Sequence, residues 1–165
     1  MGEYALEPLA YLITFTTYGT WLHGDDRGSV DRSHNRPGAP VIPGFGERVE
    51  RVKNLLPYPA FSLTARHRGV VKQTIETVCS HRGWHLHALH VRTNHVHLVV
   101  TAPVCPEKVL NALKSWSTRR LRESRLVERR PLWTRHGSTR YLWKSHQVTR
   151  ACRYVVEGQG LDLPE

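Results

Sequence analysis

Two histidines separated by one residue are the feature whose residue types and spacing could most directly do chemistry. His95 and His97 lie in the segment HVHLVVT, which predicts a β-strand. Residues two apart in a strand point to the same face, so both imidazoles meet there while Val96, Leu98 and Val100 face the core. Two neutral imidazoles can share one divalent cation and leave positions for a third ligand and for substrate oxygens. Taken alone, the tripeptide also fits histidines on a half-exposed strand face.

Tyr154, in the segment RACRYVVEGQG, is a second candidate. It follows His97 by 57 residues (154 minus 97) and falls in a predicted C-terminal helix. A phenol with an unperturbed pKa of about 10 is a poor nucleophile and needs help from a metal, a cation or a base. If the helix packs on the sheet face that carries the histidines, the phenol can reach a phosphate held by the metal. The alternative is a tyrosine that anchors the helix in the core.

Periodicity and turn residues predict the elements that must position these side chains. They are a strand at Leu9–Thr17, a helix capped by Ser62 or Thr64 and ending at Arg82, strands at Trp84–Arg92 and His95–Thr101 joined by a Thr93-Asn94 turn, a helix at Pro106–Ser124, a strand at Thr139–Trp143 and a helix at Gln147–Glu157. The order βαββαβ is that of the ferredoxin-like α+β fold, one antiparallel sheet with two helices on one face. The last helix is then available to cover the other face.

The sequence also predicts one long irregular insertion and the faces of the strands and helices that are buried. Residues 19–59 are rich in Gly, Pro and charged residues and predict an irregular insertion in a single domain, with a short helical piece at 47–56. In the strand at Trp84–Arg92, alternation places Trp84, Leu86 and Ala88 on one face and His85, His87 and Leu89 on the other. We interpret the two histidines as surface residues. The predicted buried side of the second helix is Val109, Leu110, Leu113, Trp116 and Leu121.

The net charge and the cysteine content indicate which partners the protein binds and in which compartment it works. The 165 residues carry a formal net charge of +10, which favours a polyanionic partner. A hydrophobic fraction of 39% excludes a fully disordered chain. Three cysteines without CxxC spacing argue against a disulfide framework or a Cys-based zinc site and favour a reducing cytosol. No secretory signal and no run of about 20 apolar residues is present, so nucleic acid is preferred to a membrane.

The segment HVRTNHVHLVV, followed by a helix bearing Tyr154, resembles the HUH-superfamily single-tyrosine transposases, which include insertion-sequence and REP-associated tyrosine transposases. The resemblance extends to the opening strand YLITFTTYGT, the basic second helix and the Leu142-Trp143 pair. It covers nearly the whole chain outside residues 19–59. Relaxases, with a third histidine and an N-terminal tyrosine, and initiators, with paired tyrosines, fit less well.

The resemblance implies that His95 and His97 bind Mg²⁺ or Mn²⁺ and that Tyr154 attacks a phosphorus of single-stranded DNA. The products would be a 5′-phosphotyrosine link and a free 3′-OH, and rejoining would reverse the step. Family members usually carry a Gln or Asn ligand one turn after the tyrosine, where this chain has Gly158. We favour Gln159, which is the family's residue type, over Glu157, which has the better spacing.

The resemblance also implies hairpin DNA as the partner, in the bacterial cytosol at the nucleoid, for a monomer or a homodimer. Predicted phosphate contacts are Lys114, Arg119, Arg120 and Arg122, and predicted base contacts in the insertion are Trp21, His23 and Arg27. Two alternatives remain: a catalytically silent hairpin-binding relative, and a zinc hydrolase using the two histidines. The hydrolase lacks an obvious acidic ligand and leaves the basic charge unexplained.

Overall fold

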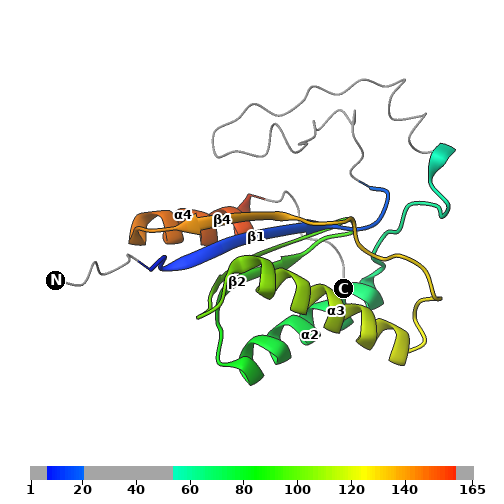
Figure 1. Ribbon diagram of the computed structural model, residues 1–165, viewed down its shortest axis with the longest axis horizontal. Coiled ribbons are helices and arrows are strands. Elements are labelled where there is room, and N and C mark those ends of the chain that lie inside the picture. Colours follow the sequence, from blue (N-terminus) through cyan, green and yellow to red (C-terminus); the bar gives the residue numbers. More distant parts are fainter. Residues whose placement is uncertain (1–6, 21–53, 159–165) are drawn as a thin grey trace.

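Four strands form one antiparallel sheet, and helices cover both of its faces (Figure 1). The computed structural model describes residues 7–20 and 54–158. The strands are β1 (Ala10–Thr16), β2 (His85–Val91), β3 (His95–Thr101) and β4 (Ser138–Leu142), in the sheet order β2-β3-β1-β4. This order and the alternation of strands with helices confirm the predicted ferredoxin-like α+β fold.

Helices α2 (Ala65–Arg82) and α3 (Pro106–Glu123) lie together on one face of the sheet, and α4 (Ser145–Glu157) lies on the other (Figure 1). The larger apolar core fills the space between the sheet and the α2–α3 layer, where Ile13, Leu98 and Leu113 are fully buried. No helix in the described ranges is long and apolar enough to cross a bilayer.

The ends of the helices follow the local chemistry of the sequence. Thr64, rather than Ser62, is the N-cap of α2, and its hydroxyl accepts from the His67 amide. Gly83 ends α2 in the left-handed region, at a φ of 67° that favours glycine. Helix α4 begins at Ser145, two residues before the predicted start, because the Gln147 side chain accepts from the Lys144 amide and caps the first turn.

Two face predictions were wrong. A bulge between Leu86 and Ala88 shifts the register of β2, so Ala88 packs under α4 while Leu89 joins the larger core. In α3 the prediction fails only at Trp116, which is 37% exposed, while the neighbouring Ser117 is buried. The stripe that faces α2 and the sheet therefore runs through Leu113, Ser117 and Leu121.

The predicted insertion lies mostly outside the described residues, including its candidate base contacts Trp21, His23 and Arg27. Its base is fixed: the Phe61 amide donates to the Tyr18 carbonyl at 2.8 Å. Gly19 has a φ of +73°, and a Cβ there would lie 3.0 Å from the Ala60 Cα, so a side chain at this position would be strained. Of the predicted short helix at 47–56, the structure describes residues 54–56, of which Asn54 and Leu55 are helical.

Candidate active site

His95 and His97 begin β3, immediately after the hairpin turn. The Arg92 amide donates to the His95 carbonyl at 2.8 Å and closes the turn at Thr93 and Asn94. The two imidazole centroids lie 4.5 Å apart with their planes at 71°. Val96, Leu98 and Val100 are fully buried in the larger core on the opposite face. The prediction that the two rings share a face of a central strand is therefore confirmed.

Each imidazole is oriented by a hydrogen bond at Nδ1. His95 Nδ1 lies 2.6 Å from the Asn94 carboxamide oxygen, which can only accept, so the proton sits on Nδ1. His97 Nδ1 lies 2.7 Å from the hydroxyl of Thr14, its partner across the β1–β3 pair. Histidine ligands in metal sites are commonly oriented in this way. With Nδ1 engaged in both rings, coordination of a metal would use Nε2.

Asn94 is itself held by the end of β1 and the base of the insertion. Its carbonyl accepts from the Thr17 amide at 2.9 Å and from the Thr17 hydroxyl at 3.3 Å. The Thr20 hydroxyl bonds to the Thr17 carbonyl at 2.8 Å. These contacts fix the turn that orients His95.

Tyr154 projects from α4 over the histidine end of the sheet. Its ring centroid lies 5.6 Å from that of His97, in an edge-to-face arrangement. The side chain is 49% exposed, whereas Ala151 and Val155 are the buried residues of α4. Tyr154 therefore does not act as a core anchor for the helix, and its ring is accessible to a substrate beside His97.

Gly158 allows the Tyr154 ring to occupy this place. A Cβ at Gly158 would come within 2.7 Å of the Tyr154 carbonyl oxygen and 2.9 Å of its ring carbon Cδ2. The φ of Gly158 is −80°, so its close approach to Tyr154, and not its backbone conformation, requires a glycine. At the position four residues after Tyr154, the packing of the tyrosine itself therefore leaves no room for a side chain.

In the part of the chain that the structure describes, the histidine pair belongs to no group of three His, Cys, Asp or Glu side chains that could hold a metal ion. Glu157 is described and exposed, and it does not complete such a group. Gln159, the favoured candidate, lies outside the described residues.

His85 and His87 lie at the far end of the sheet from this site. His85 pairs with Thr101, the last residue of β3, whereas His95 is the first. The His87 Nε2 lies 2.7 Å from the Thr101 hydroxyl. Burial and the neighbouring His85 lower the pKa of His87, which favours its neutral form.

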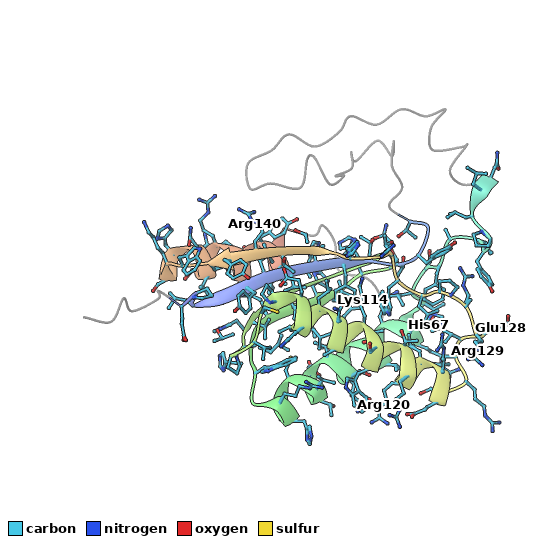
Figure 2. The ribbon with its side chains drawn as sticks, viewed as in Figure 1. His67, Lys114, Arg120, Glu128, Arg129 and Arg140 are labelled. Carbon is cyan, nitrogen blue, oxygen red and sulfur yellow. The ribbon has the colours of Figure 1, made fainter. Side chains whose placement is uncertain are left out.

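The predicted DNA-contacting residues lie on the α3 side of the sheet, opposite α4, as Figure 2 shows for Arg120 and Lys114. Arg119 and Arg120 both pair with Glu123, at 2.9 and 3.5 Å, and the Arg119 hydrogen bond is the main cause of the lowered pKa of that carboxyl. Arg122 donates to the Arg130 carbonyl at 3.4 Å. The face that carries the histidines also carries an exposed cation, Arg140 (Figure 2). The β1–β4 register pairs Arg140 with Leu12, which packs against the apolar cluster on the α4 side of the sheet.

Lys114 bonds to the protein's own backbone. Its ammonium donates to the carbonyls of Thr134 (2.7 Å) and His136 and lies 5.9 Å from the Phe15 ring centroid. These bonds tie α3 to the segment before β4. A phosphate contact by Lys114 stays a prediction.

Burial lowers the pKa of Lys114 from 10.5 to about 8. Between these values the unfolded chain binds the proton more tightly, so the protein gains stability as pH rises through this window. We expect the Tm of the wild type to rise relative to the Tm of Lys114→Met as the pH increases from 7.5 to 10. Thermal unfolding at several pH values measures this difference. Parallel Tm curves for the two proteins would contradict it.

Comparison with known proteins identifies the family. Residues 57–155, more than half of the chain, match the family described as "Transposase IS200 like". This chain is an IS200-like transposase. The matched segment of this transposase includes the two histidines and Tyr154 and ends before Gly158.

Two solved structures share the fold of this transposase. A candidate transposase from Deinococcus radiodurans R1 is 17% identical, with 98% of each chain covered and a TM-score of 0.52. A REP-associated tyrosine transposase bound to a REP hairpin is 12% identical and has a TM-score of 0.51. That comparison covers 94% of the present chain and 70% of the other. A search of curated proteins gives no match.

Thr14 and Asn94 are site residues that the sequence analysis missed. Asn94 precedes His95 directly, so its place in a tight turn next to a candidate ligand was a usable signal. Thr14 is opposite His97 only because of the β1–β3 register. Its role becomes visible once that register is known.

Proposed function

We propose that this IS200-like transposase cleaves and rejoins single-stranded DNA, with Tyr154 as nucleophile and His95 and His97 as metal ligands. The observation that carries the proposal is the contact between Tyr154 and His97, whose ring centroids are 5.6 Å apart although 57 residues (154 minus 97) separate them. Such convergence of an accessible phenol and two oriented imidazoles on one sheet face suits phosphoryl transfer.

Tyr154 would attack a backbone phosphorus through its phenolic oxygen. The bond from phosphorus to the 3′ oxygen breaks, the phenol gives up its proton and the 3′ oxygen gains one. The products are a 5′-phosphotyrosine and a free 3′-OH. Attack by another 3′-OH reverses the step and rejoins the DNA, so the bond energy is retained in the enzyme–DNA link.

The residues present fit a divalent cation in their chemistry, because both imidazoles are oriented at Nδ1 by Asn94 and Thr14. A Mg²⁺ or Mn²⁺ ion held by His95 and His97, with Gln159 as the favoured further ligand, would supply Lewis-acid polarisation of a phosphate oxygen. Thr14 and Asn94 keep the two rings in the orientation that this binding needs. The Tyr154 side chain would meet the phosphate from the α4 side.

Hairpin DNA is the partner that the charge and the structural relatives support. The REP-associated relative was solved with a hairpin, and exposed arginines on α3 offer phosphate contacts, chiefly Arg119, Arg120 and Arg122. A hollow beside α3, lined by Lys114, Ser115, Thr118, Arg122 and Trp133, combines cations with an indole ring. This surface would bind DNA backbone and an unpaired base.

A labelled oligonucleotide with a hairpin and single-stranded flanks tests the proposal. We expect a covalent protein–DNA adduct on a denaturing gel with Mn²⁺, no adduct with EDTA, and none with a fully paired duplex of the same sequence. Binding of hairpins without an adduct on any substrate would instead indicate a silent hairpin-binding protein, the alternative that the glycine at position 158 favours. Gel filtration with light scattering would distinguish a monomer from a homodimer.

A further inference from the structure

His90 occupies an unusual place between the histidine pair and α4. It lies on β2 directly opposite His97 in the antiparallel register. The bulge between Leu86 and Ala88 changes which residues of β2 face α4, and His90 follows Ala88 on that side. Without the bulge, strict alternation would place His90 on the face of Leu86 and the larger core.

The His90 imidazole bonds to the helix that carries Tyr154. Its Nδ1 lies 3.1 Å from the carbonyl oxygen of Val155. A carbonyl can only accept, so His90 Nδ1–H is the donor. Val155 is in the last turn of α4, which ends at Glu157. The bond therefore joins β2 to the end of the helix, one residue after Tyr154.

The apolar contact between α4 and the sheet contains many small side chains. Its buried cluster consists of Ala10, Ala88, Val99, Leu142, Ala151 and Val155. Three of these six are alanines, and α4 adds the partly buried Val148 and Cys152 to its buried Ala151 and Val155. Small side chains make up half of the buried cluster, which limits the apolar docking energy. The orientation of the last turn therefore depends on directional contacts, of which the His90 hydrogen bond is one.

We propose that His90 is a positioning residue, which fixes the last turn of α4 so that Tyr154 lies over His97. Its effect on DNA cleavage rests on the function proposed above, whereas its effect on α4 does not. His90 acts through the backbone of Val155 and would touch neither the DNA nor the metal. A role as a third ligand is less well supported, because no three-residue metal group forms among the described residues.

Three variants separate these roles: His90→Ala removes the donor, His90→Gln keeps an amide donor, and His87→Ala is a matched histidine deletion on the same strand at the far end of the sheet. Hydrogen exchange of metal-free, DNA-free protein reports the last turn of α4. We expect His90→Ala to accelerate exchange at residues 154–157 by about 2- to 10-fold, the range for loss of one hydrogen bond. His90→Gln would restore part of the protection, and His87→Ala would change nothing there.

Adduct formation and Mn²⁺ titration complete the test. We expect His90→Ala to lower the maximal rate of adduct formation about 10-fold, with an unchanged Mn²⁺ affinity and partial rescue by His90→Gln. Unchanged exchange in His90→Ala would overturn the proposal. A drop in Mn²⁺ affinity of tenfold or more would also overturn it, by making His90 a ligand. Faster exchange in His90→Ala with no adduct in the wild type would uphold the positioning role and refute the proposed function.

Discussion

Replacing Tyr154 with phenylalanine abolishes covalent attachment to DNA, with an expected loss in adduct rate on the order of 10⁴- to 10⁶-fold, as for removal of a catalytic nucleophile. The change deletes one oxygen and keeps the ring that packs against His97. The side chain is half exposed, so the variant folds and its unfolding temperature stays close to that of the wild type. Quantification of the adduct on denaturing gels, with far-ultraviolet circular dichroism on the same samples, measures both effects.

Tyr141→Phe is the matched control for this experiment. Tyr141 is also exposed, at 44%, but it lies on β4 and stacks on Trp143 with ring centroids 5.8 Å apart. We expect this variant to form the adduct at the wild-type rate. Persistence of the adduct in Tyr154→Phe would refute the assignment of Tyr154 as the nucleophile. Loss of the adduct in Tyr141→Phe would instead indicate Tyr141, on β4, as the nucleophile.

His97→Ala is expected to reduce Mn²⁺ affinity by at least about 100-fold, and His95→Ala similarly, because each change removes one of two imidazole ligands. Isothermal titration or electron paramagnetic resonance of Mn²⁺ measures this without DNA. The adduct is lost at moderate Mn²⁺ in both variants. His97 is buried at 7% exposure, so its alanine variant also loses some stability, whereas the half-buried His95 should tolerate the change better.

A graded series separates ligands from the residues that orient them. Thr14→Val removes the hydroxyl beside His97 Nδ1 and keeps the shape of the side chain, so we expect about a 10- to 100-fold loss of Mn²⁺ affinity. His85→Ala, at the other end of the sheet, should leave the affinity unchanged. Equal affinities in the wild type and His97→Ala would rule out this metal site.

The fold was predictable because each element has a local cause. The β-branched segment HVHLVVT, in which Val96 and Leu98 alternate with two histidines, defined β3, and the cap at Thr64 with the stop at Gly83 defined α2. The same alternation placed His95 and His97 on one face, which the structure confirms. These features depend only on neighbours along the chain.

What could not be predicted depends on register and on packing between elements. A bulge adds one residue to β2 without a sequence signal, so the faces of Ala88 and Leu89 were exchanged and His90 was overlooked. Trp116 was assigned to the buried side of α3 from the helical spacing of apolar residues, although the small Ser117 suits the surface between α3 and its neighbours. The approach of Tyr154 to His97 depends on which sheet face α4 covers, which no local pattern specifies.

The sheet separates two surfaces of different composition. Exposed arginines lie on α3, while the imidazoles and the phenol lie on the side of α4. If one DNA molecule engages both, its chain must pass around the outside of the sheet, because the backbone hydrogen bonds between the strands leave no passage through it. The distance along the DNA between the segment bound at α3 and the cleaved phosphate would then depend on the width of the protein rather than on a base sequence.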